Sequence, residues 1–338
     1  MFDRKRHPLQ ICRPLIGLCV GIVLFALSAS FVFAEGPDAT STILANVPSC
    51  RYGAVAFRPE DAAWVGPLNL GWHLNFYSIS TLSPEAVEFA PVIRVLQDKE
   101  GCTRKPGYSL FPALTDEDLG AIVKSRPGAL WIVGNEPDRG PNPEDTACEQ
   151  RVQDDTEPQV YARAYHDAYA FIKRVDPTAQ VAPAGLVQVT PGRLQYLDIV
   201  WNTYQQLYGD DMPVDAWNMH LYILPEALPD GQPNGIANIA VGTDPALAIR
   251  GSGDDPEKCA DDSVYCYAEH DNMTEFAKQI VAMRQWMKNH GQQGKPLLLT
   301  EYSILYPYVL DNPPDPASCY LKDEYGNCFT PERVVSFA

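Results

Sequence analysis

Short apolar segments alternate with longer amphipathic segments along most of this chain, which is the pattern of buried strands and helices. Seven apolar segments have the length and composition of strands: 52–57, 70–77, 88–95, 130–138, 180–186, 214–222 and 296–301. Segments with apolar residues at three- and four-residue spacing predict helices: 115–124, 157–175, 193–208, 274–289 and the first turns of one over 331–338. Strands separated by helical segments favour a parallel sheet with right-handed crossovers.

The segment over 130–138 reads Leu-Trp-Ile-Val-Gly-Asn-Glu-Pro-Asp. A continuous apolar run of this length is typical of a strand that is buried on both faces. Pro137 ends the strand because proline has no amide hydrogen to donate. Asn135 and Glu136 are therefore expected at the carboxyl end of a buried strand, where parallel α/β enzymes place their reactive groups.

The strand count favours a (β/α)₈ TIM barrel over an open sheet, and no Gly-rich phosphate loop follows the first strand as it would in a dinucleotide-binding fold. A single barrel domain over 51–338 accounts for the length, because barrels commonly reach this size as one unit. The eighth strand is missing, and the chain stops in an apolar stretch as a helix begins. We therefore expect a truncated form of a longer protein.

The first 34 residues resemble a signal peptide, with a basic start, a long apolar run and small residues before Glu35. At 20 residues, 15–34, the run could also span a bilayer, so a retained anchor is the alternative. Either reading predicts an exported protein, with a linker over 35–50. Removing residues 1–34 changes the formal charge from −17 to −20. The strong negative charge of the chain after residue 34 argues against nucleic acid or an anionic membrane as a partner. Membrane contact is expected only if the leader is retained.

Seven cysteines remain after the leader: Cys50, Cys102, Cys148, Cys259, Cys266, Cys319 and Cys328. An exported protein is expected to form disulfides, and the spacing fits no zinc site. Two local bonds are plausible, Cys259–Cys266 and Cys319–Cys328. The odd count leaves one cysteine over, and Cys50 is expected to pair within the missing segment.

Two carboxylates, Glu136 and Glu301, end the fourth and seventh predicted strands. Because side chains alternate along a strand, Glu136 should point with Ile132, and Glu301 with Leu299, over the barrel mouth. Two acids facing each other across such a mouth suit glycosidic bond cleavage, in which one protonates the leaving oxygen and the other attacks or activates water.

Three short motifs resemble those of the large clan of retaining (β/α)₈ glycoside hydrolases: Asn135-Glu136-Pro137, His220-Leu221-Tyr222 and Thr300-Glu301-Tyr302. Together with Trp72 and Asn75, the stretch over 134–138 is similar to the endo-β-1,3-glucanase-type family of that clan, often labelled a glycosyl hydrolase catalytic core. The resemblance implies that Glu136 is the acid/base, Glu301 the nucleophile and Asn135 a ligand of the sugar 2-hydroxyl. It also implies that His220, Tyr222 and Tyr302 line the substrate site, with Tyr222 near Glu301. The aromatic platform that the clan has on its eighth strand is absent from this sequence.

Other readings stay open for several residues. Trp72 and Asn75 could stack on or bind sugar, or could pack structurally, and His73 is interpreted as structural. Arg94 and Arg58 could hold a catalytic carboxylate ionised or form surface ion pairs. No cofactor is expected, and His220 lacks a second histidine at metal-ligand spacing.

We therefore expect a monomeric, exported hydrolase of a β-linked polysaccharide, with a β-1,3-glucan favoured. One alternative is a non-catalytic carbohydrate-binding or wall-associated barrel. Another is a hydrolase of xylan, mannan or galactan.

Overall fold

A computed structural model describes residues 49–56, 59–65, 67–80, 87–143, 145–148, 153–252, 264–265, 270–305, 319, 323 and 327–337. The expected leader over 1–34, nearly all of the expected linker, Arg58 and the pair Cys259 and Cys266 lie outside the described residues. Within the described part of the chain, no helix has the length and apolar character that crossing a membrane requires.

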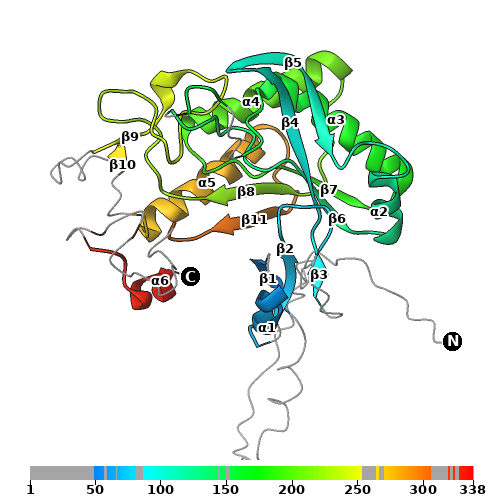
Figure 1. Cartoon of the computed structure of the whole chain (residues 1–338), viewed down its shortest axis with the longest axis horizontal. Coiled ribbons are helices and arrows are strands. Elements are labelled where there is room, and N and C mark those ends of the chain that lie inside the picture. The colour runs from blue at the N-terminus through cyan, green and yellow to red at the C-terminus, as the bar shows by residue number, and fades with distance from the viewer. Residues whose placement is uncertain are drawn as a thin grey trace, which may run out of the picture.

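Parallel strands follow one another in space in the order of the sequence (Figure 1). One parallel group contains β1 (Ser49–Val55), β2 (Leu70–Leu74) and β3 (Glu88–Phe89). The second contains β4 (Val92–Glu100), β6 (Leu130–Val133) and β7 (Gln180–Pro183), and the third β8 (Trp217–Leu221) and β11 (Leu297–Tyr302). The parallel α/β class is confirmed. Residues of β11 contact β1, but no strand pairing joins the two within the described residues, so a closed barrel stays a prediction.

The helices of the described residues are α1 (Ala62–Val65), α2 (Leu119–Ser125), α3 (Pro158–Val175), α4 (Pro191–Tyr208), α5 (Met273–Asn289) and α6 (Pro331–Phe337), with 3₁₀ turns at Pro59–Asp61 and Pro245–Leu247. The starts of α3, α4 and α5 have recognisable local signals, whereas α2 begins later than expected. Both α3 and α4 start on a proline, which has no amide hydrogen to lose there. The side chain of Asn272 caps α5 by accepting from two amides of its first turn. The helix expected from residue 115 begins at Leu119 instead, because Thr115 forms a turn by accepting from the amide of Asp118.

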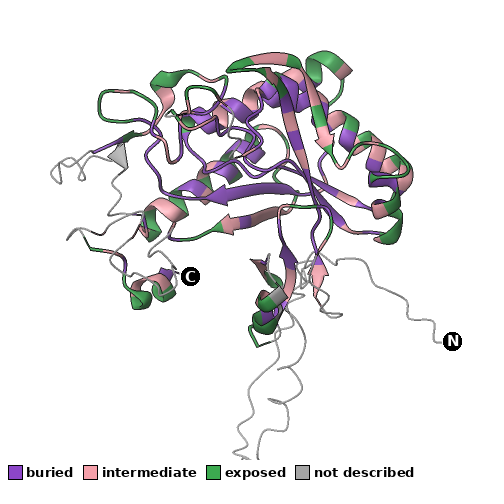
Figure 2. Cartoon of the chain, in the orientation of Figure 1, coloured by how far each residue is buried: buried purple, intermediate pink, exposed green. Residues whose placement is uncertain are grey.

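The strands separate two apolar cores. Trp131 and Val133 of β6 point outward into a large core shared with α2, α3, α4 and α5, the outer core. Leu130 and Ile132 point inward into a second cluster, the inner core. Figure 2 shows these central strands buried and the outer turns of the helices exposed. The prediction that β6 is buried on both faces is therefore confirmed.

The edge strand β5 (Thr103–Phe111) was not predicted, and neither were the two-residue strands β9 (Arg250–Gly251) and β10 (Val264–Tyr265). Strand β5 pairs antiparallel with β4 at the edge of its sheet. A disulfide between Cys102, at the turn of this hairpin, and Cys148 ties the hairpin to the loop that follows β6. The predicted bond between Cys319 and Cys328 is confirmed. The strands β9 and β10 form a small separate pair.

Candidate active site

Glu136 is held in a strained turn after β6. The strand ends at Val133, Gly134 follows at φ +93°, and Glu136 itself has φ +44° although a proline comes next. The left-handed region is costly for a residue with a side chain, and such strain persists where the surroundings fix it. One fixing contact is the hydrogen bond that the amide of Glu136 donates to the carbonyl of Gly185, at 3.1 Å. The expectation that Glu136 points with Ile132 assumed that the strand continues to Glu136. That assumption is wrong, because β6 ends at Val133.

Asn135 is anchored from the other side of the turn. Its amide donates to Oδ2 of Asp154 at 2.7 Å, and its side-chain amide donates to Gln153 Oε1 at 2.7 Å. Asp154 is fully buried and is paired with Arg94. Arg94 thus neither contacts a catalytic carboxylate nor forms a surface pair; it balances the charge of the residue that anchors Asn135.

Glu301 reaches the site through a β-bulge. Leu297 and Leu299 pack on the outer core, so simple alternation would direct Glu301 outward with them. The pairing of β11 with β8 shifts between Leu299 and Glu301, and Glu301 lies opposite His220. The extra residue at this shift turns Glu301 inward. The orientation expected from sequence is confirmed, but the shared direction with Leu299 is wrong.

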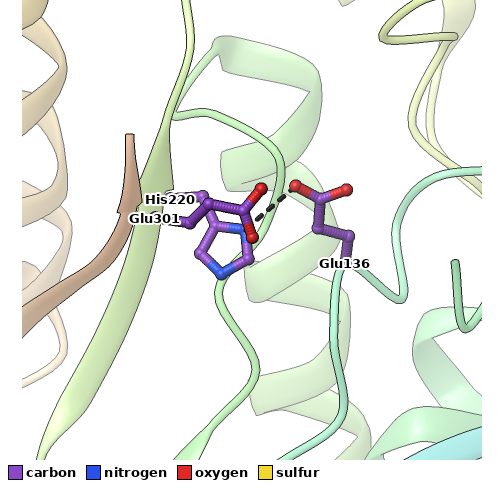
Figure 3. Close-up of side chains that lie close together, drawn as sticks. All are labelled: Glu136, His220 and Glu301. Atoms are coloured by element: carbon purple, nitrogen blue, oxygen red, sulfur yellow. Dashed lines mark hydrogen bonds and ion pairs between the residues drawn. The ribbon is translucent and has the colours of Figure 1, made fainter. Parts of the chain in front are cut away.

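Figure 3 shows the imidazole of His220 beside the carboxylate of Glu301, with the carboxylate of Glu136 approaching both from one side. Its Nδ1 is 2.9 Å from Glu136 Oε1, within hydrogen-bond distance, and 3.5 Å from Glu301 Oε2. The imidazole lies against Gly185, where a Cβ would come within 2.3 Å of its Cδ2. One side-chain donor atom from each of Glu136, His220 and Glu301 lies within 4.8 Å of the others. The structure thus brings together residues from the ends of β6, β8 and β11.

Tyr222 completes the cluster. Its hydroxyl donates to Glu301 Oε1 at 2.6 Å, as the sequence resemblance implied. The other carboxylate oxygen, Oε2, is buried and accepts no hydrogen bond within the described residues. The carboxylate of Glu301 is therefore held by a hydrogen bond at Oε1 and lies beside the His220 imidazole at Oε2.

Burial and neighbouring charges favour retention of a proton at this site. Burial raises the pKa of Glu136, and the charge of Glu301 acts in the same direction against the opposing influence of His220. Burial opposes the charged form of His220, but attraction to Glu301 and Glu136 outweighs it and raises the pKa of the imidazole. Burial, together with Glu301, also raises the pKa of Tyr222 well above its usual value. The Glu136–His220 pair should thus hold a proton to higher pH than an isolated carboxyl group.

Three expected substrate contacts have structural partners within the described residues. Tyr302 follows Glu301 and points to the opposite face, where its ring contacts Phe276 of α5 and Phe337 of α6. The side chain of Asn75 is engaged by its own loop, since it accepts from the amide of Tyr77 and donates to the carbonyl of Ile79.

Trp72 packs beside the inner core, over Gly53 of the neighbouring strand. His73 is within hydrogen-bond distance of Ser80, which agrees with its structural interpretation.

Sequence reasoning missed the residues that support the site. Gly185 makes room for His220, and Asp154 and Gln153 hold Asn135. Nothing in the sequence pattern singled these residues out, because they lie in loops far from the motifs they contact.

A scan against models of known protein families found no match, and neither did a search of curated proteins. Two solved structures have detectable similarity. One is a GH128 (subgroup I) endo-β-1,3-glucanase from Amycolatopsis mediterranei in complex with laminaritriose, 15% identical with a TM-score of 0.43, over 85% of this chain and 78% of that chain. The other is a GH128 (subgroup III) curdlan-specific exo-β-1,3-glucanase from Blastomyces gilchristii in complex with glucose, 15% identical with a TM-score of 0.36, over 52% and 62% of the two chains. TM-scores this low carry no argument about the present chain.

Proposed function

We propose that this protein is an exported glycoside hydrolase that cleaves a β-linked glucan by double displacement, with retention of anomeric configuration. The observation that carries the proposal is the approach of two carboxylates, one from the turn after β6 and one from β11, with His220 in contact with both. Oxygens of Glu136 and Glu301 lie within 4.8 Å of each other. This separation favours retention, because inverting enzymes keep their carboxyl groups about 6.5–9.5 Å apart to admit a water molecule.

The reaction assigns different roles to the two acids. The carboxylate of Glu301, whose Oε1 accepts from Tyr222, attacks the anomeric carbon, and the glycosidic bond breaks as Glu136 transfers its proton to the leaving oxygen. Formation of the glycosyl-enzyme removes the charge of Glu301, so Glu136 then accepts a proton from the water that hydrolyses the ester. The motif resemblance over 134–138 favours a β-1,3-glucan over xylan, mannan or galactan.

The test is hydrolysis of a polysaccharide panel by the wild-type protein, followed by NMR of the first product. We expect reducing sugar from a β-1,3-glucan, and the first product should have the β-configuration. Glu136→Gln and Glu301→Gln should each lower turnover by about 10²–10⁴-fold with little change in Tm. Binding of glucan without release of reducing sugar would support the non-catalytic alternative, and near-wild-type turnover in either variant would refute the assigned roles.

A second reading follows from the same three side chains, because one imidazole nitrogen and two carboxylate oxygens can also hold a divalent cation. The geometry disfavours this reading, since His220 Nδ1 and Glu136 Oε1 already bond to each other at 2.9 Å. A cation would have to separate them. We therefore expect dialysis against EDTA to leave hydrolysis unchanged. Loss of activity that is restored by a divalent metal would favour the metal site.

A further inference from the structure

Arg193 is a buried cation in an unusual place. It lies in the first turn of α4, and its side chain has no exposed surface. A positive charge is unfavourable at a helix N-terminus, and a buried charge requires close partners. The structure provides two carboxylates, Asp138 and Glu226, which outweigh the effect of burial and raise the pKa of Arg193.

The first partner belongs to the turn that carries Glu136. Arg193 pairs through Nη1 with Oδ2 of Asp138, two residues after Glu136. Pro137, between them, accepts a hydrogen bond from the amide of Thr156 at 2.8 Å, and Asp138 accepts one through its own carbonyl from Val241 at 2.9 Å. The ion pair with Arg193 therefore anchors the carboxyl side of the strained residue, as Asp154 anchors its amino side.

The remaining contacts of Arg193 organise the long loop after β8. Nε donates to Glu226 Oε1 at 2.7 Å, and Nη2 donates to the carbonyls of Ala237 and Asn238, each at 2.9 Å. The other carboxylate oxygen of Glu226 accepts from the amide of Ile249 at 2.9 Å. One guanidinium thus joins the beginning and middle of this loop to the Glu136 turn.

We propose that Arg193 is a positioning residue for the acid/base: through Asp138 it holds the Glu136 turn, and through Glu226 it fixes that turn to the loop after β8. This inference rests on the proposed hydrolase function. A lysine cannot replace Arg193, because an ammonium group lacks the planar fork that meets carboxylates and carbonyls on several sides.

The experiment exploits the dependence of acid catalysis on the leaving group. A 2,4-dinitrophenyl group leaves without a proton, whereas the alcohol of a glucan needs one from Glu136. kcat/KM is measured for Arg193→Lys and Asp138→Asn with a glucan oligosaccharide and with the dinitrophenyl glycoside of the same sugar. This constant reports the steps up to formation of the glycosyl-enzyme. We expect a loss of about a hundredfold for the oligosaccharide, as for a displaced catalytic group, and a small one for the activated substrate.

Ile172→Ala is the matched control, because Ile172 is fully buried in the outer core and its truncation lowers Tm without touching the turn. This variant should lose activity equally on both substrates, if it loses any. Asp138→Asn keeps the shape of the side chain and serves where Arg193→Lys does not fold. Equal losses on both substrates, or none, in the Arg193 and Asp138 variants would overturn the inference alone. A wild-type protein that cleaves no glycoside would overturn the proposed function and this inference with it.

Discussion

Gly185 has to be a glycine because the imidazole of His220 occupies the place of a side chain. A Cβ built on Gly185 would lie 2.3 Å from Cδ2 and 2.6 Å from Nε2 of His220. The ring is wedged between Gly185 on one side and the two carboxylates on the other. It therefore has no free direction in which to yield.

Gly185→Ala should for this reason displace His220 and disturb Glu136 and Glu301 together. We expect kcat on glucan to fall by about a hundredfold, which is the usual cost of moving a catalytic group by about 1 Å. Gly294→Ala is the control, because a Cβ there meets no atom within 4 Å. Equal activities of the two variants would show that the position of His220 does not matter for turnover.

The sequence motifs indicate the side chains that meet at the candidate site but not the residues that support them. Glu136, Glu301, His220 and Tyr222 could be predicted because each ends an apolar strand and belongs to a short motif. Arg193 could not be predicted in this way, because it lies in a helix whose apolar spacing is explained by packing alone. Its partners Asp138 and Glu226 are 55 and 33 residues away in the sequence. Buried ion pairs of this kind depend on tertiary packing, which local patterns do not encode.

At the scale of elements, the strands could be predicted more securely than the direction of the side chains on them. Alternation places Glu301 with Leu299, and the bulge in β11 reverses that relation. The edge strand β5 was missed because it contains Pro106 and Gly107, which argue against a strand. Proline is tolerated at a sheet edge, where its missing amide hydrogen breaks no ladder bond.

The β4–β5 hairpin gives a stability prediction, since its turn is fastened to the loop after β6 by Cys102–Cys148. The two cysteines are 46 residues apart, so the bond removes considerable freedom from the unfolded chain. Replacing both with serine should lower the free energy of unfolding by about 2–4 kcal/mol in urea titrations. An unchanged midpoint would indicate that the hairpin is held by its other contacts, among them the ion pairs of Asp155 with Lys99 and Arg104.

At the scale of the whole molecule, His270 connects three segments around the site. Nδ1 is 3.0 Å from the carbonyl of Ile223, after β8, and Nε2 accepts from the amide of Leu305, after β11, at 2.8 Å. Both contacts are satisfied by one neutral tautomer, with the hydrogen on Nδ1. The ring also lies parallel to that of Tyr222, the residue whose hydroxyl donates to Glu301.

Protonation of His270 would put a second N–H against the amide of Leu305, and it is strongly opposed. Burial lowers the pKa of His270 to about 4 in the folded protein, against about 6.5 in the unfolded chain. Because the unfolded state binds the proton first as pH falls, the contribution of His270 to stability is complete above pH 6.5 and decreases until pH 4, by at most about 3 kcal/mol.

His270→Gln can make both hydrogen bonds without titrating, so its free energy of unfolding should depend less on pH across this window. Burial also lowers the pKa of His73. Its contribution to the dependence of unfolding free energy on pH is therefore the same in the wild type and in the His270→Gln variant. Urea midpoints measured from pH 4 to pH 7 decide the point: equal slopes for wild type and variant would mean that His270 takes up no proton on unfolding.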